Sequence, residues 1–195
     1  MNISVDAFPL SLESNSGIPN YVRSLLSHIL EIDVLNNYFL YSKRPVLFQD
    51  ALNLIYRFKD GTTVESTSYG NTLWLFTKGV ELMQKDKIDI FWGMRHMLPP
   101  YLPKGIKKVL TVYDLVWYYY PETMDRYNLL IAKLLFKRSI KKADHIITIS
   151  QATAKSLQEV LHVPSNKITI AYPAADGFSR LDKIASAEYI ARKYN

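Results

Sequence analysis

The chain has 195 residues, a formal net charge of +6, 48% hydrophobic residues and 22% charged residues. These values are typical of a globular domain with a sizeable core and exclude an intrinsically disordered chain. The absence of cysteine excludes disulfide bonds and thiolate metal sites. Residues 1–6 lack the features of a signal peptide, and no apolar run approaches the roughly 18 residues that span a bilayer. We therefore expect a soluble, cytoplasmic protein.

Strand-like and helix-like patterns alternate along the chain. Strands are expected at residues 3–7, 38–41, 62–65, 88–92, 107–113, 144–149 and 167–172. Helices are expected at residues 21–32 and 72–83, after Pro121, and at 152–161 and 181–194. Residues 45–57 have no clear period, and a helix is one interpretation of them. About seven strands with helices between them predict an α/β fold, in which a Rossmann-like, doubly wound, mostly parallel sheet carries helices on both faces.

The helix after Pro121 is expected to be the longest, and two stripes run along it. The apolar stripe consists of Tyr127, Leu130, Ile131, Leu134 and Leu135. The basic stripe, at a spacing of four, consists of Lys133, Lys137 and Lys141. Residues 104–142 carry 9 Lys and Arg against 3 Asp and Glu, an excess that equals the net charge of the whole chain. Such a face attracts phosphates, anionic lipid or nucleic acid, and a merely solvated helix face is an equal alternative.

Several common ligand motifs are absent. No two of the seven glycines stand two positions apart, which excludes the usual Gly-x-Gly-x-x-Gly dinucleotide loop and the P-loop. The four histidines include no pair at helical spacing beside a carboxylate, so no zinc site is predicted. There is no Gly-x-Ser-x-Gly nucleophile motif either. We expect neither a metal nor a cofactor.

Polar segments follow four of the expected strands and should meet at the carboxyl edge of the sheet, where α/β proteins bind ligands. The first holds Asp6 and the loop to Gly17. A glycine there lets the backbone approach a ligand at a helix start, although Pro19 also suits a purely structural start. The second holds His96, which either exchanges a proton near neutral pH or is simply solvated.

The third segment places Asp114 just past a strand, where a carboxylate holds sugar hydroxyls or caps the next turn. The tyrosines at 118–120 that follow either stack on a sugar, face lipid or pack into the core. The fourth is the junction at Ser150, where a strand ends and a helix begins. The helix-start amides there can bind a phosphate or hydroxyl, and Ser150 can equally serve as a plain N-cap.

Segments 16–21, 91–99, 111–117 with 120–124, 143–153 and 163–173 resemble, in order and spacing, the amino-terminal half of a family 4 (group 1) retaining glycosyltransferase. The mannosyltransferase-like branch is the most similar. The resemblance implies one half of a GT-B fold, in which two Rossmann-like domains face each other across a cleft. It also implies a nucleotide-sugar donor, a glycan or lipid-linked acceptor, no metal, and peripheral contact with the inner face of a membrane. Nucleic acid is not an expected partner.

The resemblance assigns roles to individual residues. The loop with Gly17, Ile18 and Asn20 lies near the donor phosphates, and Ser150 with Gln151 lines the cleft. The catalytic set consists of Tyr113 and Asp114, which reach the transferred sugar, and of His96. Relatives commonly have His-Asp where this chain has Tyr113-Asp114; a phenol donates a hydrogen bond but titrates near ~10 and cannot mimic the charge of histidine.

The expected division is an acceptor-side domain at 1–180 and a terminal helix or linker at 181–195. Because relatives continue into a donor-binding domain where this chain stops at Asn195, we expect negligible transferase activity from this chain alone. The alternative function is that of a non-catalytic binding module. Such a module would retain the fold and use its basic helix or sheet edge for a partner or a membrane.

Overall fold

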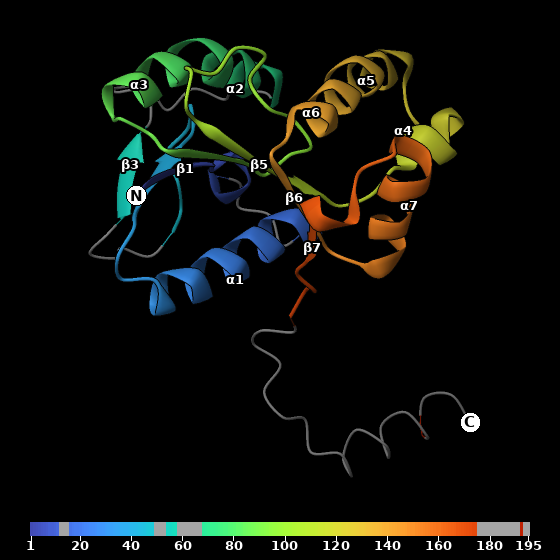
Figure 1. Ribbon diagram of the computed structural model, residues 1–195, viewed down its shortest axis with the longest axis horizontal. Coiled ribbons are helices and arrows are strands. Elements are labelled where there is room, and N and C mark those ends of the chain that lie inside the picture. The colour runs from blue at the N-terminus through green and yellow to red at the C-terminus, as the bar shows by residue number, and fades with distance from the viewer. Residues whose placement is uncertain (12–15, 49–53, 58–67, 175–191, 193–195) are drawn as a thin grey trace.

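The centre of the fold is a parallel sheet of seven strands in the order β3-β2-β1-β4-β5-β6-β7 (Figure 1). The computed structural model describes residues 1–11, 16–48, 54–57, 68–174 and 192. The strands are β1 (Asn2–Asp6), β2 (Asn37–Tyr41), β3 (Leu54–Arg57), β4 (Ile90–Gly93), β5 (Lys107–Val112), β6 (His145–Thr148) and β7 (Ile168–Ile170). Every pairing is parallel, so all seven carboxyl ends lie at one edge. The predicted Rossmann-like fold class is confirmed.

Helices cover both faces of the sheet (Figure 1). The α-helices are α1 (Gly17–Ile32), α2 (Ser68–Trp74), α3 (Val80–Lys85), α4 (Val116–Tyr119), α5 (Arg126–Ile131), α6 (Lys137–Lys142) and α7 (Gln151–Leu161). Short 3-10 turns are η1 (Phe8–Ser11), η3 (Pro121–Thr123) and η5 (Ser165–Lys167), and π-helical turns are η2 (Leu75–Gly79) and η4 (Ala132–Phe136). No helix in the described ranges is long and apolar enough to cross a membrane.

Two hydrophobic clusters hold the layers together. On one face, Tyr21, Val22 and Leu26 of α1 pack on alternate residues of the central strands, such as Val5 and Leu40. The cluster on the other face includes Met83 of α3, Ile140 of α6 and Leu157 of α7. Since successive side chains of a strand point to opposite faces, β2 and β4 each supply buried residues to both clusters.

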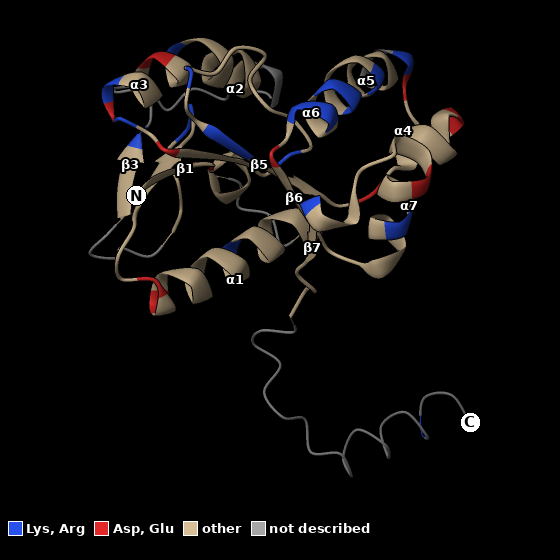
Figure 2. Ribbon diagram, viewed as in Figure 1, with Lys and Arg blue, Asp and Glu red and all other residues tan. Residues whose placement is uncertain are grey.

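The long helical segment after Pro121 buries a different side from the one the sequence predicts. Leu130 and Leu134 of the expected apolar stripe are 55% and 61% exposed, whereas Ala132 and Ile140 are buried. The segment contains the π-helical turn η4, in which i→i+5 hydrogen bonding shifts the register of the side chains. The prediction of a buried Leu130 and Leu134 is therefore wrong. The basic stripe does lie on the solvent side, and Figure 2 shows Lys and Arg gathered on α5 and α6.

The first half of the chain departs from the prediction at its third strand. Residues 54–57, for which a helix was one interpretation, form β3 and pair with β2 in the register Tyr38↔Leu54. The segment is a strand because it forms hydrogen bonds with β2 at the edge of the sheet. Such pairing with a distant segment does not show in the local sequence pattern. The strand expected at 62–65, the helix expected at 181–194 and the domain boundary expected at 180 lie outside the described residues.

Candidate functional site

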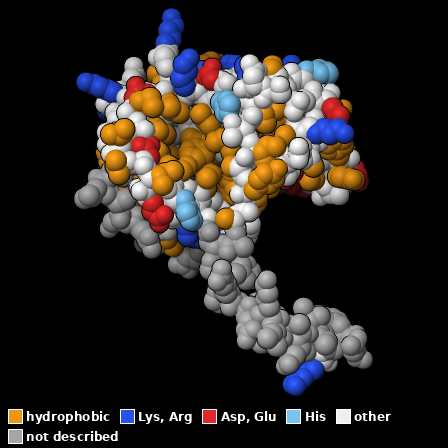
Figure 3. Space-filling model, turned by 60° about the horizontal axis from the view of Figure 1, so that its bottom comes forward, with side chains coloured by type: hydrophobic (Ala, Val, Ile, Leu, Met, Phe, Trp, Pro, Cys, Tyr) orange, Lys and Arg blue, Asp and Glu red, His pale blue; other side chains and the backbone are white. Residues whose placement is uncertain are grey.

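A cavity of about 840 Å³ lies between α1 and the carboxyl ends of β5 and β6. Figure 3, turned to bring the lower side of Figure 1 forward, shows hydrophobic side chains gathered around a hollow on this side. Helix α1 contributes Gly17, Ile18, Asn20, Tyr21, Arg23, Ser24, Ser27 and His28. The strand ends contribute Tyr113, Asp114 and Ile149, and the segment after β7 contributes Pro173 and Ala174. Five of the predicted site residues, from two distant parts of the chain, therefore meet here.

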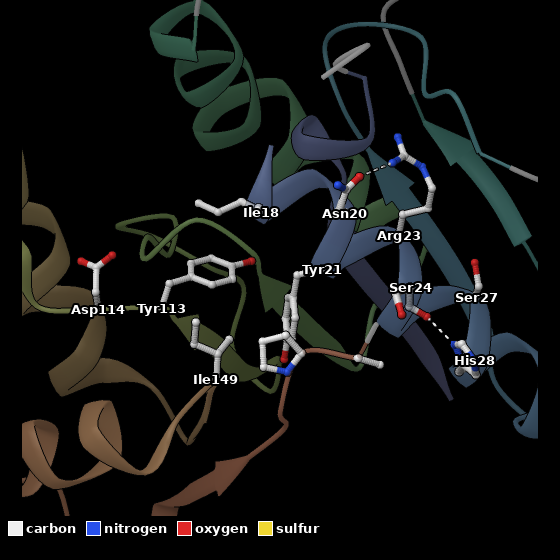
Figure 4. A pocket seen from close by; sticks show the side chains of 13 residues that line it. Ile18, Asn20, Tyr21, Arg23, Ser24, Ser27, His28, Tyr113, Asp114 and Ile149 are labelled. Atoms are coloured by element: carbon white, nitrogen blue, oxygen red, sulfur yellow. Dashed lines mark hydrogen bonds between the residues drawn. The ribbon is translucent and has the colours of Figure 1, made fainter. Parts of the chain in front are cut away.

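Two tyrosines form an aromatic wall of the cavity (Figure 4). The rings of Tyr21 and Tyr113 meet edge to face, with centroids 5.7 Å apart and an interplanar angle of 87°. The Tyr113 hydroxyl donates to the carbonyl of Met94 at 3.0 Å, and the Tyr21 hydroxyl donates to the carbonyl of Ala171 at 3.1 Å. Burial raises the pKa of both phenols, so both stay protonated. Because its hydroxyl is engaged inward, Tyr113 offers its ring rather than a hydrogen-bond donor to the cavity.

Asp114, the residue after Tyr113, contributes an exposed carboxylate to the lining of the cavity. Its Oδ1 accepts a hydrogen bond from the backbone N–H of Val116 at 3.1 Å, which confirms the interpretation as a cap for the next turn. Within the described part of the chain, no hydrogen bond or ion pair engages its Oδ2. One carboxylate oxygen therefore fixes the side chain, and the other remains available to a hydroxyl in the cavity.

His96 is not among the described residues that line the cavity, since it is buried behind Tyr113 with 8% of its surface exposed. The alternative of a solvated loop histidine is therefore wrong. The backbone N–H of Tyr113 donates to its Nε2 at 3.4 Å, and its ring lies between those of Tyr113 and Phe136. Burial lowers the pKa of His96 to about 4, so the ring is neutral at physiological pH. This geometry suits a residue that positions the wall.

The first turn of α1 lines the cavity with Gly17, Ile18 and Asn20. A Cβ added at Gly17 would meet no atom within 4 Å, so this backbone is open to a ligand. Arg23 Nη1 donates to Asn20 Oδ1 at 3.3 Å, which places a cation next to the helix start (Figure 4). Amides of a first helical turn and a neighbouring guanidinium are groups that proteins use for anions.

A family model described as glycosyltransferase family 4 matches residues 16–176, most of the chain. This chain belongs to glycosyltransferase family 4. No curated protein sequence is similar enough to this glycosyltransferase domain to be counted as its relative. The matched range includes α1, the strand ends of the cavity and the junction at Ser150.

In this family 4 domain the Ser150 junction has a structural role. The Ser150 hydroxyl accepts from the backbone N–H of Thr153 at 3.1 Å, so Ser150 is the N-cap of α7. Neither Ser150 nor Gln151 is among the described residues that line the cavity, although the preceding Ile149 is. Thr153 in turn donates to the carbonyl of Tyr113 at 3.0 Å. The hydrogen bonds of this junction therefore hold the backbone of Tyr113, whose side chain lines the cavity.

Another predicted polar strand end is used internally by the glycosyltransferase domain. Asp6 at the end of β1 forms a buried ion pair with Arg95, with Nε and Oδ2 2.8 Å apart and side chains 2% and 12% exposed. The Arg95 guanidinium also lies over the ring of Phe8, 4.7 Å from its centroid. This pair fills the crevice between β1 and β4, the point where the strand order reverses.

The sequence interpretation missed the polar side of α1 beyond Asn20. Ser24, Ser27 and His28 line the cavity together with the predicted Asn20, and His28 Nδ1 bonds to the carbonyl of Ser24 at 2.8 Å. Their spacing of four, three and one is that of a single helix face, opposite the apolar residues Val22 and Leu26. That polar face was a signal available in the sequence.

The basic stripe lies apart from the cavity in this glycosyltransferase domain. Lys133, Lys137 and Lys141 line a separate shallow groove of about 330 Å³ on η4 and α6. Tyr118, Tyr119 and Tyr120 are between 47% and 59% exposed, so the alternative in which they pack into the core is wrong. Their neighbour Trp117 is the core residue of α4. Among the described residues, no three His, Asp or Glu side chains come together as metal ligands would.

Proposed function

We propose that this family 4 domain is the acceptor-side half of a glycosyltransferase that transfers a sugar from a nucleotide-sugar donor to a glycan or lipid-linked acceptor. The single observation that carries the proposal is the cavity of about 840 Å³ between the polar side of α1 and the strand end at Tyr113 and Asp114. Its place at the carboxyl edge of a parallel sheet is where α/β enzymes hold their substrates.

The chemistry of the walls supports a sugar as the ligand. Sugars expose hydroxyl groups around rings with apolar faces, so their sites combine hydrogen-bonding side chains with aromatic surface. The cavity provides the ring of Tyr113, the available Oδ2 of Asp114 and the polar groups of Asn20 and Ser24. We propose that Asp114 accepts from a hydroxyl of the transferred sugar while Val116 N–H holds the carboxylate in place.

The start of α1 suits the diphosphate of the donor. We propose that Gly17, Ile18 and Asn20, with the guanidinium of Arg23, face the phosphate side and stabilise the charge of the leaving group. A donor-binding domain, in the same polypeptide or on a separate chain, would supply the opposite wall. Retention of anomeric configuration and a mannose-like sugar are the finer parts of this proposal.

His96 takes a positioning role in the proposal. Its imidazole accepts from the Tyr113 N–H and thereby fixes the backbone that carries Asp114. A neutral, buried imidazole that does not line the cavity has no path to a sugar proton. We therefore propose Asp114 as the residue of this set that touches substrate, and Tyr113 as its aromatic neighbour.

The test combines calorimetry with a reconstitution. This chain is titrated with GDP-sugars, UDP-sugars and acceptor glycans, alone and with a candidate donor domain, and transfer is followed in the mixture. We expect transfer only in the mixture. Asp114→Asn should reduce transfer at least tenfold, because the amide still caps Val116 but loses the negative charge, and a hydrogen bond to a charged group contributes about 1.5–3 kcal/mol.

The matched control is Glu122→Gln, which removes one negative charge from the exposed turn η3 outside the cavity. We expect its transfer rate to equal that of the unmodified chain. Silence with every donor and with the complementing domain, or equal rates for Asp114→Asn and Glu122→Gln, would contradict the proposal. Such a result would favour the non-catalytic binding module instead.

A further inference from the structure

The cavity beside α1 extends beyond the groups that the proposed function uses. Gly17 and His28 both line it, and at ~1.5 Å per residue these two positions lie about 16 Å apart along the helix axis. The proposed function places phosphates at the first turn of α1 and the transferred sugar at Asp114. It assigns no ligand to the part of the cavity beyond Ser24, whose described lining includes Ser27 and His28.

A smaller cavity of about 140 Å³ adjoins this part. The described residues that line both cavities are Tyr21, Ser24, His28 and Ala174. The smaller cavity adds the side chains of Leu25 and Tyr172, and the ring of Tyr172 is 65% exposed. We call the two spaces together the distal compartment. Its described lining consists of Ser24, Leu25, Ser27, His28 and residues 172–174.

Two hydrogen bonds hold the backbone that carries Tyr172. The N–H of Ala171 donates to the carbonyl of Thr148 at 2.8 Å, and the carbonyl of Ala171 accepts from the Tyr21 hydroxyl at 3.1 Å. The second bond ties the segment after β7 to α1, although the two residues are 150 positions apart in the sequence. The aromatic wall that Tyr172 gives to the distal compartment is therefore part of the packed fold.

The distal compartment provides hydrogen-bonding groups without a fixed charge. Ser24 and Ser27 carry hydroxyls, which both donate and accept. His28 Nδ1 lies 2.8 Å from the carbonyl of Ser24, and because a carbonyl only accepts, Nδ1 carries a proton. The described lining of the compartment contains no Asp, Glu, Lys or Arg. The nearby Arg23 bonds instead to Asn20, toward the start of α1 (Figure 4).

This lining suits a neutral sugar better than an anion or an acyl chain. An anion would find no Lys or Arg among the described residues of the compartment. An acyl chain would cover the serine hydroxyls and the imidazole without offering them hydrogen bonds, which costs free energy. A sugar ring offers hydroxyl groups to Ser27 and His28, and its apolar face can pack on the ring of Tyr172.

We propose that the distal compartment binds a second sugar unit of the acceptor. The acceptor is then a neutral glycan of at least two sugar units that lies along α1. Its terminal unit lies near Asp114, and the next unit packs on Tyr172 within reach of Ser27. This inference rests on the proposed function, which places sugar transfer at Asp114.

The test compares the affinities of the full chain for a monosaccharide and a disaccharide by NMR titration. The probes are the methyl glycosides of mannose and mannobiose, with the corresponding glucose and galactose pairs in parallel. We expect at least one disaccharide to bind about tenfold more tightly than its monosaccharide, the factor that one or two net hydrogen bonds contribute. The octyl glycoside of the same monosaccharide should bind like the methyl glycoside. An octyl monosaccharide that matches the disaccharide would overturn the proposal, because an apolar group would then fill the compartment.

Variants connect the gain in affinity to the distal compartment. Tyr172→Ala should reduce the disaccharide affinity to that of the monosaccharide, Ser27→Ala should reduce it severalfold, and Tyr172→Phe should keep most of the gain. The matched controls are Tyr101→Ala and Ser165→Ala, which change exposed residues outside both cavities and should bind the disaccharide as the unmodified chain does. Circular dichroism should show that every variant folds. Equal losses in the test and control variants would refute the assignment.

The outcomes for this inference and for the proposed function differ. If monosaccharides and disaccharides bind with equal affinity, the second sugar unit has no subsite, whereas a sugar site near Asp114 remains supported. If nucleotide-sugars bind but none of the glycans does, the distal compartment is not a sugar site. Failure of every sugar and every nucleotide-sugar to bind would contradict the proposed function and this inference together.

Discussion

The backbone N–H of Tyr113 donates a hydrogen bond to Nε2 of the buried His96, 3.4 Å away. Because this nitrogen accepts, the imidazole proton is on Nδ1, for which the described residues provide no partner. Burial lowers the pKa of His96 to about 4, and the negative charge of Asp114 opposes only part of this effect. The folded protein therefore prefers the neutral ring that holds Tyr113 in place.

This preference predicts a pH dependence of stability. An unfolded histidine titrates near 6.5, so between pH 6.5 and about 4 the unfolded chain binds a proton that the folded chain excludes. The free energy of unfolding should fall as the pH is lowered through this window, by up to about 1.4 kcal/mol per pH unit from this group. Denaturant unfolding at several pH values measures the slope.

The control for this prediction is His96→Asn. Asparagine tolerates the left-handed backbone of this position, where φ is 59°, and does not titrate. Its unfolding free energy should change less steeply between pH 6.5 and 4 than that of the unmodified protein. Asp33, whose hydrogen bonds with Asn36 and Tyr38 lower its pKa to about 2, loses its contribution below this window. Identical slopes for the two proteins would refute the assignment to His96.

Replacement by alanine should destabilise the fold at Gly93 but have little effect at Gly17. At Gly93 an added Cβ would stand 2.5 Å from the backbone oxygen of Met97, so Gly93→Ala should destabilise the fold by about 1–3 kcal/mol. At Gly17 the same change meets open space, and we expect a change of stability within about 1 kcal/mol. Thermal unfolding compares the two. A Gly93→Ala variant as stable as Gly17→Ala would mean that this strand end shifts without cost.

The buried Asp6–Arg95 pair should be far more important for stability than the pairs at the surface. Asp6→Ala removes the carboxylate that pairs with the buried guanidinium of Arg95 and should cost about 3–5 kcal/mol. Glu159→Ala breaks the exposed pair with Lys155, whose nitrogen lies 3.7 Å from Glu159 Oε1, and should cost less than about 1 kcal/mol. Urea unfolding of both variants tests the contrast, and similar midpoints would disprove it.

Ser150→Ala tests the capping role of the strand-to-helix junction. Loss of the bond to the Thr153 N–H should lower stability by about 1 kcal/mol. Sugar or nucleotide binding by the folded variant should be unchanged, because Ser150 is not among the described residues that line the cavity. A large loss of binding at unchanged stability would instead show that Ser150 contacts the ligand. Calorimetry and thermal unfolding on one preparation distinguish these outcomes.

Metal independence follows from the proposed chemistry of α1. If first-turn amides and Arg23 stabilise the diphosphate, transfer by the reconstituted enzyme should continue at the same rate in excess EDTA. Arg23→Gln should then lower the rate substantially, and added Mg²⁺ should not rescue it. Inhibition by EDTA that Mg²⁺ reverses would show that a metal performs this role.

The pattern of residues predicted most of the architecture correctly. The segments around Val5, Leu40 and Ile146 show β-prone runs between helical periods, and each forms a buried strand of the parallel sheet. Local composition suffices there because strands favour β-branched and aromatic residues, which are frequent in these segments. The local pattern did not suffice at 54–57, where pairing with β2 makes the segment a strand. It also did not suffice in the helical segment after Pro121, where a π-helical turn changes which side chains are buried.

The candidate site was only partly predictable for the same reason. Asp114 and Gly17 were expected at one edge of the sheet, and both line the cavity. Nothing local indicates that His96 is buried behind Tyr113, or that Asp6 is paired with Arg95 89 residues away. Burial and ion pairing depend on which segments the fold brings together, and sequence spacing does not encode them directly.

The sequence by itself therefore determined the fold class, most of the strand and helix order and the resemblance to glycosyltransferase family 4, because these depend on local periodicity and motif order. The tertiary structure decided which polar strand ends share a cavity and which are used internally. Asp114 faces α1 across open space, whereas Asp6 and Ser150 satisfy partners inside the fold. The physical reason is that a polar side chain near a core is either paired by the packing or left for a ligand, and only the packed chain shows which.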